Sequence, residues 1–189
     1  METTDLQKIK SFAFKRYSQN TSQHDIRHVE MVNNNALKIC AILGKDREID
    51  RNLLSAAGYL HDILKTNIKG GLIFSMYYYL FERSLNRKHL SGIIKRFNLP
   101  ENESKILENA IINHPHSIPF HQLNGKNDIY SQILQDADSI DYVSDTRLVS
   151  FNKKMRFLSP ISKLYIYLIR KNIRFFLNFP EIAKKLDSF

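Results

Sequence analysis

The 189-residue sequence is poor in the residues that stiffen or cross-link a chain: it has one cysteine, five prolines, six glycines and no tryptophan. Cys40 has no partner for an internal disulfide, which suits a reducing compartment. We interpret Cys40 as a core residue, because it falls within an apolar helical pattern. A chain of this length buries roughly two-thirds of the surface it exposes when unfolded, so a stable fold requires no disulfide.

The sequence also lacks a long uninterrupted hydrophobic run. The most apolar stretches are residues 68–81 and 158–179. The first is too short to cross a bilayer, and four basic residues interrupt the second. The N-terminal region has early acidic residues and no apolar segment typical of a signal peptide. We therefore expect a cytoplasmic protein with no transmembrane segment.

Positive charge is concentrated near the C-terminus. The formal net charge is +9, and residues 147–189 contain ten basic and two acidic side chains, a balance of +8. Such a region could attract nucleic acid, an anionic membrane surface or phosphate-bearing ligands, although a solvated helix face is an equally open interpretation. No helix-turn-helix pattern is present, and we interpret the aromatic residues of this region as packing surface: Tyr165, Tyr167, Phe175, Phe176 and Phe179.

No alternating strand pattern or hairpin signature is present, and apolar residues recur at helical spacing throughout. Gly44 should end one helix, and Asp50 is a suitable N-cap for the next. The sequence predicts an all-α, single-domain protein with the following helices: 4–18, 22 or 23 to about 43, 51 to about 65, about 86–97, about 102–114, 129 to about 151, and a last region from Pro160 that is split near 178–180.

Three segments place histidines and acids inside apolar helices: 24–29, 59–65 and 134–141. In the second, His61 and Asp62 follow an apolar helix face, and at least one of them must point toward the core. A buried carboxylate costs several kcal/mol unless it is paired or bound to a metal. A divalent metal can be shared by imidazole and carboxylate, and His28 and Asp138 are the best candidates for the remaining ligands.

Single residues in these segments have simpler explanations. A lone buried histidine is more often a hydrogen-bonded core residue than a metal ligand, and a lone aspartate in a helix is usually a cap or a surface charge. We interpret Asp136, Asp141 and Asp145 as surface residues or as groups that support the site. The joint pattern is harder to produce by packing alone.

The order His28, His61-Asp62, Asp138 resembles the HD superfamily of metal-dependent phosphohydrolases over about residues 20–150. The segments that carry the resemblance are HDIRHVEMV, AAGYLHDILK and LQDADSIDYV. The resemblance implies an all-α helical bundle of the HD-domain type, followed by a basic helical extension over about 151–189. It also implies a metal site with His28, His61, Asp62 and Asp138 as ligands.

The resemblance further implies hydrolysis of a phosphomonoester or phosphodiester by a metal-activated water, with a nucleotide as the favoured substrate. Lys65 lies one turn after His61 and could contact a phosphate, although it could equally be a lysine that interacts with the helix dipole. His114 and His116 lie where relatives with two metals have further ligands. Two further candidates for the site are His24 and Arg147.

The metal and the activity are open at this point. A mixed histidine and carboxylate set accepts Mn, Fe, Co, Ni or Zn, as one ion or two. The alternative function is a non-catalytic, metal-stabilised domain that senses a nucleotide or regulates a partner. A third possibility is a nucleic-acid-binding module that uses the basic C-terminal region.

Overall fold

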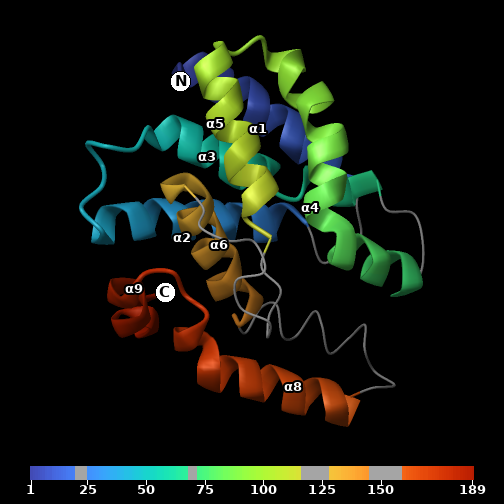
Figure 1. Ribbon diagram of the computed structural model, residues 1–189, viewed down its shortest axis with the longest axis vertical. Coiled ribbons are helices and arrows are strands. Elements are labelled where there is room, and N and C mark those ends of the chain that lie inside the picture. Colours follow the sequence, from blue (N-terminus) through green and yellow to red (C-terminus); the bar gives the residue numbers. More distant parts are fainter. Residues whose placement is uncertain (20–24, 68–71, 116–127, 145–158) are drawn as a thin grey trace.

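The computed structural model describes residues 1–19, 25–67, 72–115, 128–144 and 159–189, and every regular element in these ranges is helical (Figure 1). The all-α prediction is therefore confirmed. The elements are α1 (Thr3–Ser18), α2 (Ile26–Ile42), α3 (Arg51–Leu60), η1 (Ile63–Asn67), α4 (Leu72–Ile94), η2 (Lys95–Phe97), α5 (Glu101–Asn113), α6 (Ile129–Tyr142), α8 (Ser159–Asn172), η4 (Ile173–Phe175), α9 (Pro180–Lys184) and η5 (Leu186–Ser188).

Aspartate side chains begin the three helices that carry the motifs. Asp25, Asp50 and Asp128 cap α2, α3 and α6, and each accepts hydrogen bonds from backbone N–H groups of the first turn. Because Asp25 is extended and caps α2, this helix begins at Ile26, later than the sequence indicated. Gly44 ends α2 as predicted: it has a φ of 65°, and the next residue donates a hydrogen bond to the Cys40 carbonyl.

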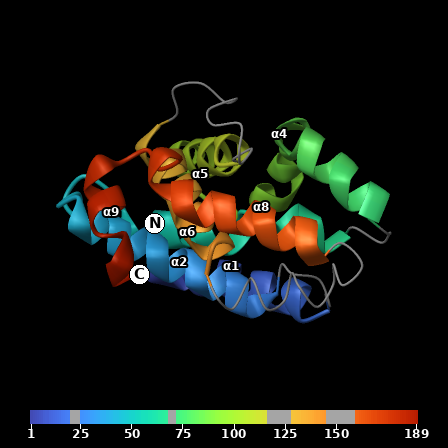
Figure 2. The same ribbon diagram turned by 90° about the horizontal axis from the view of Figure 1, so that it is seen from below.

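Helix α2 packs against α3 and α6 (Figure 1), and in the view of Figure 2 it runs along the lower side of the molecule. Helices α1 and α5 cover α3, and α4 packs on α5. Cys40 is fully buried, which confirms its interpretation as a core residue. Leu54, Leu60, Leu107 and Leu134 are also fully buried; each such side chain contributes about 1.5–3 kcal/mol through removal of apolar surface from water.

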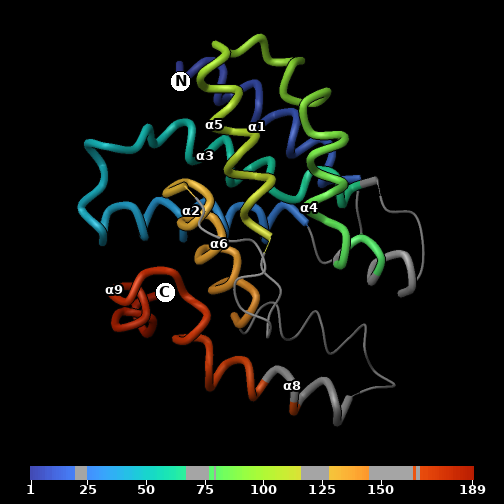
Figure 3. Tube along the Cα trace, viewed as in Figure 1, coloured from blue at the N-terminus to red at the C-terminus, as the bar shows by residue number. Residues whose placement is uncertain are grey.

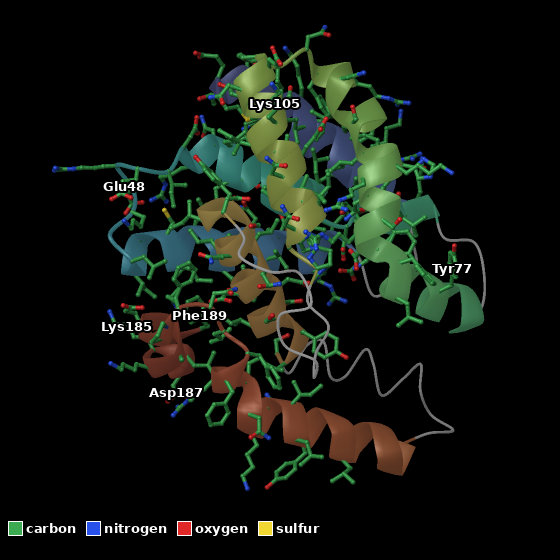
Figure 4. The ribbon with its side chains drawn as sticks, in the orientation of Figure 1. Glu48, Tyr77, Lys105, Lys185, Asp187 and Phe189 are labelled. Atoms are coloured by element: carbon green, nitrogen blue, oxygen red, sulfur yellow. The ribbon has the colours of Figure 1, made fainter. Side chains whose placement is uncertain are left out.

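Helix α4 begins at Leu72, well before the position near residue 86 that the sequence indicated. The tyrosine-rich segment 76–81, which falls outside the helices that the sequence predicts, belongs to the first half of α4. Tyr77, Leu80 and Phe81 remain exposed on this half, and Figure 4 shows Tyr77 near the start of the helix. Glu82 is buried one residue later. The longer helix is therefore what brings Glu82 to the inside of the bundle.

The C-terminal segment runs through α8, turns back and reaches α2 again through α9 (Figure 3). The predicted split near 178–180 is confirmed. Buried Asp136 of α6 holds the turn, because its carboxylate accepts hydrogen bonds from the backbone N–H groups of Asn178 and Phe179. Asp136 is therefore neither a surface residue nor a group that supports the site. The hydrogen bonds from the two N–H groups compensate for the burial of its carboxylate.

The aromatic residues of the C-terminal segment pack less completely than we expected. Ile169 and Ile173 occupy its inward face, whereas Tyr167 and Phe175 are 59% and 76% exposed. The packing interpretation is therefore wrong for these two residues. Phe176 and Phe179 are partly buried against the hydrophobic clusters, and the side chain of Tyr165 lies outside the described part. In the described ranges, no helix combines the length and the apolar character needed to cross a membrane.

Candidate metal centre

His28 lies in the first turn of α2 and is almost completely buried. Its backbone N–H donates to the Asp25 carboxylate, so the cap that begins the helix also fixes this residue. The ring places Nδ1 2.7 Å from Asp141 Oδ2 on α6. A carboxylate only accepts, so Nδ1 carries the proton and Nε2 carries a lone pair directed at the interior.

His61 and Asp62 follow the last residue of α3, and both are about 1% exposed. His61 Nδ1 donates to the Gly58 carbonyl oxygen at 2.8 Å. This bond fixes the tautomer in the same way as for His28 and leaves a lone pair on His61 Nε2. Because these two residues lie just after the end of the helix, their adjacent side chains can both be directed at the same position.

Four donor atoms from three elements converge at this point, and we call them the four-donor cluster: His28 Nε2, His61 Nε2, Asp62 Oδ2 and Asp138 Oδ1. The two imidazole nitrogens are 3.1 Å apart, and Asp62 Oδ2 lies 3.3 Å from His28 Nε2 and 3.4 Å from His61 Nε2. Asp138 Oδ1 lies 3.6 Å from His28 Nε2 and 3.9 Å from His61 Nε2. Each is an electron-pair donor, so they repel unless a cation or a proton lies between them.

The electrostatics of the cluster favour a cation. Burial lowers the pKa of His61, but the charges of Asp62 and Asp138 outweigh burial and raise this pKa to about 9. Burial raises the pKa of Asp138, but the neighbouring imidazoles lower it to about 2. Both pKa shifts have the same cause, which is the attraction between the carboxylates and positive charge on the imidazoles. Without a metal, a proton supplies that charge.

The donor set fits a divalent transition metal. Imidazole nitrogen and carboxylate oxygen suit Mn, Fe, Co, Ni or Zn, and they hold such ions at roughly 2.0–2.2 Å. His28, His61 and Asp62 offer ligand atoms within 4.8 Å of one another, and so do His61, His114 and Asp138. The side chain of Asp138 is 25% exposed, whereas those of the other three residues are about 1% exposed or less. Solvent therefore reaches the cluster from the side of Asp138.

Three residues extend the site beyond the four-donor cluster: Glu82 and His114, which are buried, and Lys65, which is partly buried. Lys65 Nζ lies 2.7 Å from Asp62 Oδ1 and 3.0 Å from Glu82 Oε1. The charges of these carboxylates outweigh burial and raise the pKa of Lys65 above its usual range. Burial raises the pKa of Glu82 to about 7, against the opposing effect of Lys65. His114 Nδ1 donates to the Ile111 carbonyl at 2.6 Å, and burial lowers the pKa of its ring to about 4.

The structure thus brings together six residues that the sequence singled out: His28, His61, Asp62, Lys65, His114 and Asp138. His24, His116 and Arg147 lie outside the described residues. Glu82 was not anticipated, because it follows the tyrosine-rich segment and no helix was expected there. Asp141 was anticipated only as a surface or supporting group, and its contact with His28 places it in the second of these roles.

The fold and the site together describe a helical bundle built around a histidine and aspartate cluster of metal-binding chemistry. The family model of the HD domain matches residues 25–143, which is more than half of the chain. The chain therefore belongs to the HD domain family, the HD superfamily of metal-dependent phosphohydrolases. No curated protein and no solved structure matches the chain.

Proposed function

We propose that the chain is a metal-dependent phosphohydrolase that cleaves a phosphomonoester or phosphodiester, with a nucleotide as substrate. The observation that carries the proposal is the four-donor cluster. Two imidazole nitrogens with lone pairs lie 3.1 Å apart beside two carboxylates. The partly exposed Asp138 marks the side on which water and substrate would enter.

In this proposal His28, His61, Asp62 and Asp138 hold one divalent ion. Mn, Fe, Co, Ni and Zn are all compatible with this ligand set. When bound, the ion would supply a polarised water and positive charge for the phosphoryl oxygens. The remaining work is done by the protein: Asp141 orients His28, and the Gly58 carbonyl orients His61, so both lone pairs stay directed at the same point.

Lys65 is our candidate for contact with the substrate phosphate. Its ammonium group has three N–H donors, and Asp62 and Glu82 engage two of them. The third can donate to a phosphoryl oxygen, and the fixed positive charge offsets the charge of the phosphate. His114 is neutral at pH 7, because burial lowers its pKa to about 4, and it lies beside His61. We propose no proton transfer for it.

The alternative is a non-catalytic HD domain that retains the metal and binds a nucleotide as a sensor or regulator. We also propose that the protein is cytoplasmic and that residues 1–189 form a single domain. The basic C-terminal region would contact nucleic acid or an anionic surface. Arg170, Lys171 and Arg174 are exposed there.

The experiment is a hydrolysis screen. The purified protein, loaded in turn with Mn, Fe, Co, Ni and Zn, is assayed against nucleotides, cyclic nucleotides and p-nitrophenyl phosphate esters. We expect turnover with at least one metal, and loss of turnover to background in His61→Ala and Asp62→Ala. Lys105→Ala, at an exposed position on α5, is the matched control. Equal turnover by the His61→Ala protein would overturn the proposal, and nucleotide binding without turnover would establish the non-catalytic alternative.

A further inference from the structure

Asp62 presents its two carboxylate oxygens to two different sets of neighbours. Oδ2 faces the imidazole nitrogens of His28 and His61 at 3.3 and 3.4 Å. Oδ1 lies 2.7 Å from Lys65 Nζ on the other side. One oxygen therefore belongs to the four-donor cluster, and the other belongs to an ion pair inside the protein.

The ion pair of Lys65 has a second carboxylate. Glu82 of α4 places Oε1 3.0 Å from Lys65 Nζ, and the Glu82 side chain is only 6% exposed. The Lys65 side chain is 11% exposed, so the ammonium group is held between two anions with little water around it. Removing an ammonium group from water is costly unless carboxylates compensate its charge. Here Asp62 and Glu82 provide that compensation.

The same place has the donors of a second cation site. Asp62, Glu82 and His114 each offer a ligand atom, and these atoms lie within 4.8 Å of one another. His114 Nδ1 donates to the Ile111 carbonyl, so Nε2 carries a lone pair. Nε2 is buried and has no hydrogen-bond partner among the described residues, and Glu82 Oε1 lies 3.9 Å from it. An unpaired buried acceptor is costly, which points to a cation as its natural complement.

We propose that the Lys65 ammonium occupies the second cation position of this centre, so that the protein binds a single divalent ion. The inference rests on the proposed metal centre, whose donors lie on the other side of Asp62. A metal bound to Asp62 Oδ1 and Glu82 Oε1 would stand where Lys65 Nζ stands. Two positive charges cannot share these two oxygens without strong repulsion at short distance.

The proposal gives Glu82 a defined task. Glu82 positions Lys65 and balances its charge, and it does not bind a metal while Lys65 is present. Removal of the ammonium, with the three acceptors left in place, should open a second metal site. The Lys65→Met variant does this with a side chain of similar length. Lys65→Gln is a second neutral variant, which keeps a polar group beside the carboxylates.

The test is metal stoichiometry, which needs no assay of hydrolysis. Metal-free wild-type protein, Lys65→Met, Lys65→Gln and Lys65→Met/Glu82→Gln are titrated with Mn²⁺. Bound ions are counted by mass spectrometry of the native protein and by electron paramagnetic resonance, which separates single from coupled manganese. Lys105→Met is the control at a surface position, and circular dichroism verifies that each variant is folded.

We expect one bound ion per chain for wild type and for Lys105→Met, two for Lys65→Met and Lys65→Gln, and one again for the double variant. Two ions in the wild-type protein, or one ion in both folded single variants, would overturn the inference and leave the metal centre intact. No ion in any protein would overturn the metal centre itself, and the inference with it. Hydrolysis can fail independently of all these counts.

Discussion

Gly58 of α3 packs directly against Asn33 of α2: a Cβ atom at Gly58 would lie 3.2 Å from Asn33 Cα and 3.3 Å from its Cβ. The first contact is with backbone, which moves only if one helix shifts relative to the other. Gly58 also accepts the hydrogen bond from His61 Nδ1. The close approach of α2 and α3 thus sets the distance between His28 and His61.

We predict that Gly58→Ala destabilises the protein by about 1–2 kcal/mol, because the close contact outweighs the roughly 1 kcal/mol that alanine gains in a helix. Gly92 of α4 is the matched control, since a Cβ there would meet nothing within 4 Å. Gly92→Ala should be neutral or stabilising. Urea denaturation of both variants tests the prediction, and equal stabilisation by both would refute it.

Asp141 accepts a hydrogen bond from His28 and orients its ring. We predict that Asp141→Ala weakens metal binding by about 10–100-fold, as is usual when the group behind a ligating histidine is removed. The fold should persist, because the four-donor cluster itself is unchanged. Competition with a chelator measures the affinity, and Asp187→Ala, at a position that is 92% exposed, is the control. An unchanged affinity would show that Asp141 has no part in orienting His28.

The His61 pKa predicts a dependence of stability on pH in the metal-free protein. This pKa is raised from 6.5 to about 9 in the folded state, so the folded protein binds the proton more tightly than the unfolded chain. The stabilisation is complete below about pH 6.5 and is lost as the pH rises through 9. Between pH 7 and 9 we expect a loss on the order of 2 kcal/mol.

Denaturation of chelator-treated wild type and His61→Ala at pH 7, 8 and 9 measures this effect. Glu82 and Asp136 have pKa values raised to about 7, so their contribution falls mainly at lower pH. Hydrogen bonds to Asp50 and Glu103 raise the pKa of the N-terminal amine in both proteins, so the variant should lose most of the dependence between pH 7 and 9 but not all of it. Saturation with a divalent metal should also abolish it, because the metal displaces the proton. Parallel curves for wild type and variant would contradict the assignment.

Asp136 ties the C-terminal turn to α6 and lies apart from the four-donor contacts. Its carboxylate accepts hydrogen bonds from the Asn178 backbone and side chain and from the Phe179 backbone. Asp136→Asn would turn an N–H donor toward one of these donors. We predict a loss of about 1–3 kcal/mol in the free energy of unfolding, with metal stoichiometry unchanged.

Asp187→Asn, at a position that is 92% exposed, is the matched control for that prediction. Its stability should equal that of wild type. If Asp136→Asn also unfolds at the wild-type denaturant concentration, the turn is held by other contacts and the role of Asp136 is wrong.

The sequence was sufficient to predict those features that depend on which residue types recur at helical spacing. The sequence predicts that four polar residues share one site, because a polar side chain inside an apolar helix needs a partner that offsets the cost of its burial. These residues are His28, His61, Asp62 and Asp138. Glu82 was not identifiable, because its partner Lys65 comes from a different element and the pair is made only by tertiary packing. The start of α4 was missed because a glycine pair directly precedes it and a run of tyrosines fills its first turns.

The exposure of Tyr167 and Phe175 is a second feature that the sequence alone does not predict. Aromatic residues next to Ile169 and Ile173 indicate a buried helix by composition alone. The face that is buried depends on what the helix meets, and here α6 and the chain end meet the isoleucine face. Sequence patterns predict that a helix has an apolar face but do not determine how much of it is covered.

We propose that one divalent ion lies among four atoms: His28 Nε2, His61 Nε2, Asp62 Oδ2 and Asp138 Oδ1. Crystals grown with Mn²⁺ test it through the anomalous scattering of the metal. We expect one strong peak at roughly 2.0–2.2 Å from these four atoms. No peak at this position, or a peak coordinated by other residues while the four donors face one another without metal, would contradict it.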